Sequence, residues 1–182
     1  MDVLSALETR SSARKLAAPG PTREHLEQIL RAGANAPDHG RLRPWRFIVM
    51  SGAACVRLGE VMAETLAAQR PDATPEQLAT ERSKALRAPT IIAVAAKITL
   101  GKIPEIEQVL STGAAVENMF LAARALGYGV MWKTGDAAYN ATVKQYLGLV
   151  PQDPIVAFLY IGTLTTAGGP TPISLEGLVT WL

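Results

Sequence analysis

Three segments of the chain carry basic side chains beside apolar stretches, and the first and third also carry hydroxyl groups. The first runs from Arg10 to Lys15 and reads Arg-Ser-Ser-Ala-Arg-Lys, the second is residues 36–47, and the third is Lys133-Thr134-Gly135. Phosphate and carboxylate ligands accept hydrogen bonds from guanidinium, ammonium and hydroxyl groups. Because only 19% of the chain is charged, the first two segments together predict a shared anion, and the third is a further candidate anion site. The alternative is that the segments are ordinary solvated turns.

The stretch 36–47 reads Ala-Pro-Asp-His-Gly-Arg-Leu-Arg-Pro-Trp-Arg-Phe and joins a predicted helix to a predicted strand. Pro37 and Pro44 bias the residues before them, Ala36 and Arg43, toward extended backbone. The loop between the prolines carries acidic, imidazole and guanidinium side chains. Such a loop can hold an anionic ligand.

Composition excludes several classes of protein. The 182 residues are 48% hydrophobic, which fits one globular domain over residues 1–182. The net charge of +2 and the aromatic content of 5% are both too low for a dedicated nucleic-acid-binding protein. A single cysteine, Cys55, excludes an intramolecular disulfide, and two histidines give no zinc-ligand spacing. We expect no metal and no nucleic acid.

The same sequence predicts a soluble, cytoplasmic protein. Its first residues, Met1 to Leu4, lack the basic and apolar regions of a signal peptide. The longest apolar run, Ala88 to Leu100, contains Lys97 and is shorter than the ~20 residues that span a bilayer. One unpaired cysteine fits a reducing compartment.

Hydrophobic periodicity and turn residues predict helices and strands in alternation. Asp2 is expected to cap a first helix with Leu4 and Leu7 facing inward, and Thr22 and Thr74 to cap two later helices. The expected helices are 3–9, 22–34, 52–69, 74–87, 104–126 and 138–147, and the expected strands are 45–50, 89–98, 130–132 and 155–162. Strands separated by helices indicate a layered αβα domain.

Three features carry less certain interpretations. His25 lies beside acidic neighbours and is expected to be a surface residue without catalytic duty. The small residues 111–115 would allow another backbone to approach, either within the core or across a subunit interface. The apolar residues 178–182 need burial, in the sheet of their own chain or of a partner.

The chain contains no Gly-x-Gly-x-x-Gly after a first strand, no Walker loop, no serine or cysteine nucleophile in a known turn, and no conspicuous pair of carboxylates. We therefore name no catalytic residue. Side chains alone are poorly equipped for difficult chemistry, which favours a borrowed cofactor.

Four features in order along the chain resemble the FMN-dependent nitroreductase family, and most closely its short NAD(P)H nitroreductase branch. They are Arg10-Ser11-Ser12-Ala13-Arg14, the loop from Ala36 to Phe47, the segment from Gly127 to Gly135, and Tyr160-Ile161-Gly162-Thr163. The resemblance implies an α+β, three-layer domain with a mixed central sheet flanked by helices. It also implies a homodimer with FMN at the subunit interface.

The resemblance implies the cofactor-binding residues as well. Phosphate and ring-edge contacts fall on Arg10, Ser11, Ser12 and Arg14, and contacts from the partner subunit's loop fall on Asn35 and His39; the third stretch is Met131, Trp132 and Lys133. The commoner family motif has a second arginine where this chain has Ser11. Arg41 and Arg43 stand where asparagine and glutamine are frequent. Either Lys133 or Arg10 is expected to stabilise the reduced flavin.

The implied function is ping-pong transfer of a hydride from NADPH or NADH to FMN, then of two electrons to a nitro compound, quinone or similar small acceptor. One alternative is another flavin reaction on the same fold, such as dehalogenation, desaturation or flavin cleavage. A second alternative is a non-catalytic module that binds an anion or a partner.

Overall fold

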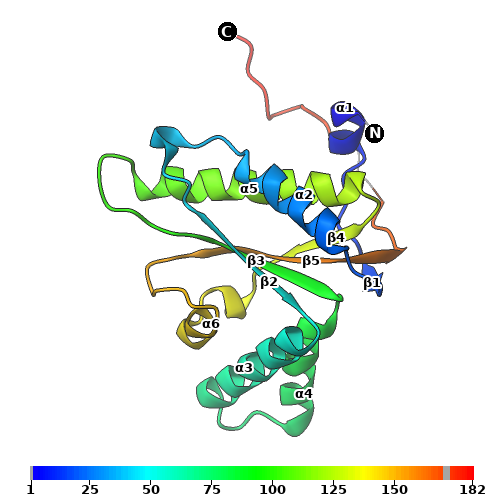
Figure 1. Ribbon diagram of the computed structural model, residues 1–182, viewed down its shortest axis with the longest axis vertical. Helices are drawn as coiled ribbons and strands as arrows, with labels where there is room; N and C mark the ends of the chain where they lie inside the picture. Colours follow the sequence, from blue (N-terminus) through cyan, green and yellow to red (C-terminus); the bar gives the residue numbers. More distant parts are fainter. Residues whose placement is uncertain (1, 170–172) are drawn as a thin grey trace.

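The computed structural model describes residues 2–169 and 173–182 (Figure 1). In chain order the elements are α1 (Val3–Glu8), β1 (Lys15–Ala17), α2 (Arg23–Ala34), η1 (His39–Arg41), β2 (Trp45–Ser51), α3 (Ala53–Gln69), α4 (Pro75–Ser83), η2 (Lys84–Leu86), β3 (Thr90–Ala96), α5 (Glu105–Ala125), β4 (Gly129–Lys133), η3 (Asp136–Ala138), α6 (Ala141–Tyr146) and β5 (Ile155–Thr166). The elements named η are single 3₁₀ turns.

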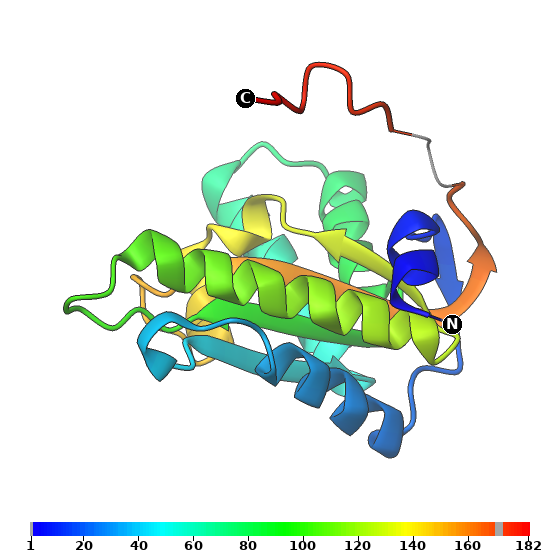
Figure 2. The ribbon, with the colours of Figure 1, turned by 90° about the horizontal axis from the view of Figure 1, so that it is seen from above.

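The strands form one five-stranded sheet with helices on both faces. The order is β1-β5-β3-β2, and β4 also pairs with β5. Helices α2 and α5 cover one face, whereas α3 and α6 cover the other and α4 packs on α3 (Figures 1 and 2). The α+β class and the three layers are confirmed. The strand directions differ from the expected mixed sheet, because each pair in the described ranges is antiparallel.

Strand β3 divides the hydrophobic core into two halves. All residues of Thr90–Ala96 are buried. Because side chains alternate along a strand, Ile91 and Ala93 pack into the core on the α3 side, whereas Ile92 and Val94 pack on the α5 side. The predicted strand covered on both faces is therefore confirmed.

Local sequence signals set the ends of the helices. The Thr22 hydroxyl accepts the His25 backbone N–H, and Thr74 and Gln77 form the reciprocal capping box that their spacing predicts. Gly127 follows α5 with φ of +90°, the left-handed conformation that ends helices at glycine. These predictions are confirmed.

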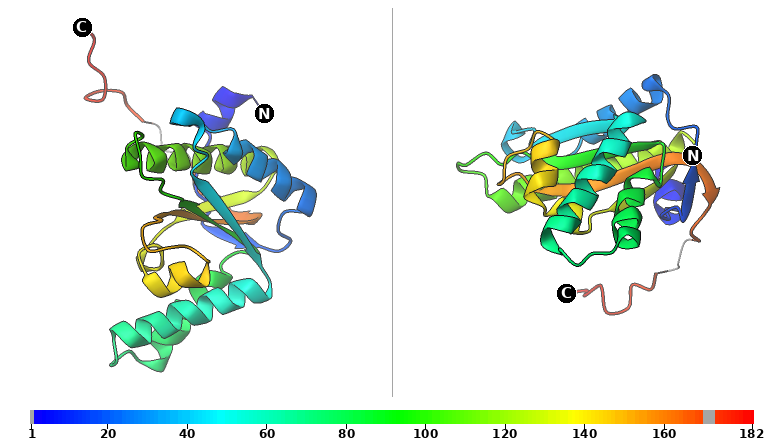
Figure 3. Two further views of the ribbon diagram at one scale, coloured as in Figure 1. Left: turned by 60° about the vertical axis from the view of Figure 1, so that its left-hand side comes forward. Right: turned by 90° about the horizontal axis from the view of Figure 1, so that it is seen from below.

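The two apolar ends of the chain differ from expectation. Leu4 and Leu7 are 70% and 47% exposed, and the residue of α1 that turns inward is Ala6. Residues 173–182 form no strand, and Trp181 is 92% exposed. Figure 3 shows this tail running away from the helices and the sheet. Within one chain these side chains find no apolar surface to cover them.

Three boundaries also differ. The sequence pattern does not predict β1, because three residues are too few to show a period. Helix α4 ends at Ser83 and continues as the turn η2, and β5 extends to Thr166 rather than ending at Gly162. The first and third differences depend on pairing between segments far apart in sequence, because β1 pairs with the extension of β5.

The loop before β2 contains backbone turns where its two prolines predict extended residues. Arg43 precedes Pro44 but has φ of +49°, and Arg41 has φ of +55°. The Arg43 backbone N–H donates to the Asp38 carboxylate at 2.6 Å, which holds the loop in this conformation. The expectation of extended backbone at Arg43 is therefore wrong. Positive φ in non-glycine residues stores strain.

Gly59 allows the close approach of α3 to α4. A Cβ atom at Gly59 would lie 2.4 Å from the backbone carbonyl oxygen of Arg82. We expect Gly59→Ala to lower the free energy of unfolding by roughly 1–3 kcal/mol, because the backbones must separate. Urea denaturation followed by circular dichroism measures this. Gly101→Ala is the control, since no atom lies within 4 Å of its Cβ position; equal losses in both variants would contradict the packing.

Candidate functional site

The segment after α1 is held between two strands by its backbone. The Ala13 N–H donates to the Val130 carbonyl at 2.8 Å, and the Arg14 N–H donates to the Thr166 carbonyl at 2.9 Å. Ala13 itself is buried and lines cavities on both sides of the segment. The basic and hydroxyl side chains around it are therefore divided between two cavities.

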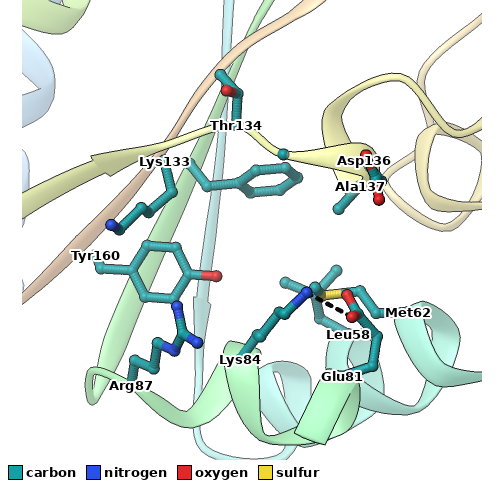
Figure 4. Close-up of a pocket in the computed structure, with 12 residues that line it drawn as sticks. Leu58, Met62, Glu81, Lys84, Arg87, Lys133, Thr134, Asp136, Ala137 and Tyr160 are labelled. Carbon is teal, nitrogen blue, oxygen red and sulfur yellow. Dashed lines mark hydrogen bonds and ion pairs between the residues drawn. The ribbon is translucent and has the colours of Figure 1, made fainter. Parts of the chain in front are cut away.

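Two adjoining cavities of about 570 and 170 Å³ open on the α3 side of the sheet and share Arg87 and Lys133. We call them together the cationic cleft. Arg14 and Lys133 both line this cleft, whereas no residue of the loop 36–47, which the sequence predicts to share an anion with the Arg10 to Lys15 segment, lines it. Figure 4 shows the smaller cavity, where the side chains of β4, β5 and η2 face one another. The residues that line the cleft are Ala13, Arg14, Lys15, Leu16, Leu58, Met62, Glu81, Lys84, Leu86, Arg87, Met131, Lys133, Thr134, Gly135, Asp136, Ala137, Phe158 and Tyr160.

The charges of the cleft are incompletely balanced. Lys84 Nζ lies 2.5 Å from a carboxylate oxygen of Glu81. Within the described ranges, no carboxylate lies at ion-pair distance from Arg14, Arg87 or Lys133. Uncompensated cations above an apolar surface attract an anion with a flat apolar body.

Tyr160 is a buried residue whose hydroxyl lines the cleft. The residue is 5% exposed, and the hydroxyl makes no hydrogen bond to another residue in the described part of the chain. Burial raises the pKa of Tyr160 to about 12, opposed by the nearby Arg87 cation. The phenol therefore stays protonated at neutral pH and offers a hydrogen bond into the cavity, beside Arg87 and Lys84 (Figure 4).

Strand alternation separates the three residues predicted on β4. Met131 and Lys133 line the cationic cleft, whereas the Trp132 indole N–H donates to the Val156 carbonyl at 3.2 Å. Trp132 is 38% exposed. Side chains next to one another on a strand point to opposite faces, so Trp132 lies away from the cleft that its neighbours line.

Arg10 and Ser11 of the N-terminal motif lie on the α5 side. The Arg10 guanidinium lies 5.4 Å from the ring centre of Phe120 and 4.0 Å from the Glu117 carboxylate. Ser11 lines a separate cavity of about 220 Å³. Ser12 is exposed. Of the four motif residues predicted to bind the cofactor, Arg14 alone lines the cationic cleft.

His39 lies at the other end of α5, whereas the neighbours of Asn35 pack against the middle of that helix. The Asn35 amide donates to the Arg31 carbonyl at 2.8 Å, and His39 Nδ1 lies 2.5 Å from the Glu107 carboxylate. Glu107 is in the first turn of α5, whereas Ser11 is bonded to Arg124 in the last. At 1.5 Å per residue these contacts are about 25 Å apart along the helix. One chain does not bring the two groups together.

His25 differs from its expected surface position. It is half-buried, and its Nδ1 lies 2.8 Å from the Tyr128 hydroxyl. The two rings meet edge to face with centres 5.6 Å apart. His25 thus joins α2 to the turn after α5 and lines none of the cavities described above.

Sequence reasoning missed Lys84, Arg87, Glu81 and Tyr160. Lys84 and Arg87 come directly before the buried strand β3, just as Lys133 ends β4. A search for basic residues beside buried strands would have found both. Tyr160 sits inside a hydrophobic run, where no local pattern separates it from a core tyrosine.

The donor set of the cleft fits FMN. Cations stabilise the negative charge that a flavin ring carries when it is reduced. Met131 and Phe158 supply an apolar surface against which a planar ring can pack. Within residues 2–169 and 173–182, no cluster of histidine, cysteine, aspartate or glutamate is suited to a metal ion. No helix in these ranges is both long and apolar enough to cross a bilayer.

Comparison with known sequences identifies related proteins. The model of a family described as "Nitroreductase family" matches residues 7–163. The chain is 42% identical over 164 residues to "Putative NAD(P)H nitroreductase YdjA" of Escherichia coli K12, covering 90% of this chain and 88% of that protein. It is 39% identical over 165 residues to "Putative NAD(P)H nitroreductase" of Haemophilus influenzae, covering 90% and 89%.

Solved structures share the fold. A nitroreductase-like family protein from Bacillus cereus has a TM-score of 0.83 at 23% identity, covering 100% of this chain and 96% of that one. A structure described as a putative nitroreductase in complex with FMN, from Desulfovibrio desulfuricans, has a TM-score of 0.78 at 25% identity, covering 100% and 97%.

The buried phenol predicts a dependence of stability on alkaline pH. Between about pH 10 and 12 the unfolded chain releases the Tyr160 proton while the folded chain retains it, so the wild-type protein loses stability as pH rises. We expect Tyr160→Phe to lack this loss, which is roughly 1–1.5 kcal/mol at pH 11. Urea denaturation of both proteins at pH 9 and pH 11 measures it. Tyr139→Phe controls for removal of an exposed phenol; parallel pH profiles of wild type and Tyr160→Phe would contradict the burial of the hydroxyl.

Proposed function

The chain belongs to the nitroreductase family, and from this premise we propose that it is an FMN-dependent NAD(P)H oxidoreductase. In the proposed reaction, FMN takes a hydride from NADPH or NADH and then passes two electrons to a nitro compound, quinone or similar acceptor. The observation that carries the proposal is the cationic cleft, where the cations Arg14, Arg87 and Lys133 surround an apolar floor. FMN in a related structure supports the choice of cofactor.

The protein's own residues would bind and tune the cofactor. Met131 and Phe158 offer contacts to one face of a planar ring, and Tyr160 offers a hydrogen bond. A fixed cation near a ring that gains negative charge makes its reduction easier. Lys133 suits this role better than Arg10, because Arg10 lies over Phe120 on the α5 side. Lys84 and Arg87 are further candidates, although Glu81 partly neutralises Lys84. No protein nucleophile is required.

We also propose that the working form is a homodimer. Ile106 and Leu110 are 61% and 64% exposed on α5, and no atom lies within 4 Å of the Cβ position of Gly113. These residues follow one another at helical spacing on one face. Exposed apolar side chains on α1 and in residues 173–182 extend this unpartnered surface. In a dimer, Asn35 and His39 of one subunit would approach the FMN of the other.

The first test compares FMN binding by the wild-type protein with FMN binding by a variant that lacks one positive charge of the cleft. We expect wild-type protein to bind FMN and Lys133→Met to bind it about tenfold to a hundredfold more weakly, because one charge-assisted interaction is lost. Quenching of flavin fluorescence measures both dissociation constants. Lys102→Met, which removes an exposed lysine outside the cavities, is the control. Equal affinities for all three proteins would argue against the cleft.

The reaction is tested by adding NADPH or NADH to the FMN-loaded protein without oxygen. We expect the flavin absorption band to bleach within seconds. A band that persists would favour a different flavin reaction, such as dehalogenation or desaturation. A chain that binds no FMN would favour the non-catalytic binding module and contradict the proposal.

The proposed dimer interface is tested by introducing a charged residue on the exposed face of α5. We expect Leu110→Glu to convert the dimer to a monomer, because burying an unpaired carboxylate opposes association. Analytical ultracentrifugation gives the mass of each species. Val150→Glu is the matched control, because Val150 is also exposed but lies in the turn after α6, on the other side of the sheet. A Leu110→Glu protein that remains dimeric would exclude this face as the interface.

A further inference from the structure

The larger cavity of the cationic cleft combines basic and apolar side chains at its exposed edge. Leu86 lines this cavity although it is 55% exposed. Lys15 and Arg87 line the same cavity and are also exposed. We call Lys15, Leu86 and Arg87 together the mouth of the cleft. An exposed leucine beside two cations suits a ligand that is both apolar and anionic.

Packing of the backbone brings the two sides of the mouth together. Lys15 lies on β1, whereas Arg87 follows the turn η2. A Cβ atom at Gly162 of β5 would lie 2.7 Å from the Pro89 side chain and 2.8 Å from the Ala17 carbonyl oxygen. Ala17 closely follows the first cation in sequence, and Pro89 closely follows the second. The absence of a side chain at Gly162 therefore allows β1 to approach the turn before β3.

The cations of the mouth have no carboxylate to balance them. In the described part of the chain, neither Lys15 nor Arg87 has a carboxylate at ion-pair distance. The acidic residues of the cleft line its smaller cavity and not the larger one. They are Glu81, which pairs with Lys84, and Asp136. The larger cavity thus carries an excess of positive charge among its described lining residues, which attracts anions.

The cleft has room for one aromatic ring beside a flavin. A cavity of about 150 Å³ holds benzene, so three fused rings of similar size need on the order of 450 Å³. The larger cavity measures about 570 Å³ and adjoins the smaller one of about 170 Å³. The space left beside a flavin ring system accommodates a molecule with a single ring, but not a second system of three rings.

We propose that the mouth selects electron acceptors that carry a carboxylate on a single aromatic ring, such as nitrobenzoates. The inference rests on the proposed function, because it names the acceptor class of the same site. The carboxylate accepts hydrogen bonds from Lys15 and Arg87, and the aromatic ring packs against Leu86. A nitro group opposite the carboxylate then points into the cleft, toward the cofactor.

The carboxylate of the acceptor takes no part in the reduction. Conversion of a nitro group to a nitroso group consumes two electrons and two protons and releases one water molecule, and NADPH or NADH supplies the electrons in the proposed function. The cations of the mouth therefore act on the binding of the acceptor and on its rate of encounter. The structural alternative is that Lys15 and Arg87 are solvated side chains that no substrate contacts.

Charge reversal at Lys15 tests the selection. The kcat/KM values for 4-nitrobenzoate and for the neutral 4-nitrobenzamide are measured on protein saturated with FMN, so that altered cofactor affinity does not enter. We expect the ratio of the two values to fall about three- to tenfold in Lys15→Met, because an exposed ion pair is lost, and further in Lys15→Glu. Lys102→Glu is the matched control, because Lys102 is exposed and lines neither cavity; its ratio should equal that of the wild type.

Binding without turnover gives an independent readout. Benzoate carries the carboxylate but no reducible group, and the change in flavin absorption on its addition gives its Kd. We expect the wild-type protein to bind benzoate more tightly than benzamide, and Lys15→Glu to lose this difference. Because salt screens exposed charges, the difference should also shrink between about 0.05 M and about 1 M sodium chloride.

Circular dichroism checks that each variant is folded. If Lys15→Glu does not fold, Lys15→Met and the salt dependence of the wild type carry the same comparison. Equal ratios in wild type, Lys15→Glu and Lys102→Glu, or benzoate binding no tighter than benzamide binding, would overturn the inference and leave the proposed function standing. A wild-type protein that binds no FMN, or whose FMN is not bleached by NADPH or NADH, would overturn the proposed function and this inference with it.

Discussion

Two backbone hydrogen bonds fix the segment on which the site depends. The Ala13 N–H donates to Val130 on β4, and the Arg14 N–H donates to Thr166 at the end of β5. Each bond contributes only about 1 kcal/mol net, but together they set the register of the segment. A shift by one residue would exchange the side chains that face each side of the sheet. The present register sends Arg14 to the cationic cleft and Ser11 to the cavity beside Arg124.

The rest of the fold supplies partners on each side of that segment. On the α3 side, the turn η2 ends just before the fully buried strand β3, so the burial of β3 fixes Lys84 and Arg87 at the rim of the cleft. On the α5 side, a single helix carries contacts at both of its ends, to Ser11 near its last turn and to His39 near its first. The length of α5 therefore requires two chains if both groups are to act on one cofactor.

Local patterns in the sequence predicted much of this arrangement. The alternation and burial of β3, the caps at Thr22 and Thr74, and the end of α5 at Gly127 follow from short-range chemistry. The expected pairing of the Arg10 to Lys15 segment with the loop 36–47 does not appear in the cleft, where Arg14 lies with Lys133 and Arg87 instead. The roles of Lys84, Arg87 and Tyr160 depend on which strands pair, and no local period contains that information. The inward-facing leucines expected in α1 were wrong, because Leu4 and Leu7 are exposed, and the apolar tail does not join the sheet of its own chain.

The most direct test is a crystal structure of the protein crystallised with FMN. We expect the isoalloxazine ring to lie in the cationic cleft against Met131, near Lys133 and the Tyr160 hydroxyl, with His39 of a second chain close to it. A ring bound on the α5 side of the sheet, or a flavin held away from Arg14 and Lys133, would contradict the assignment of the cleft as the cofactor site.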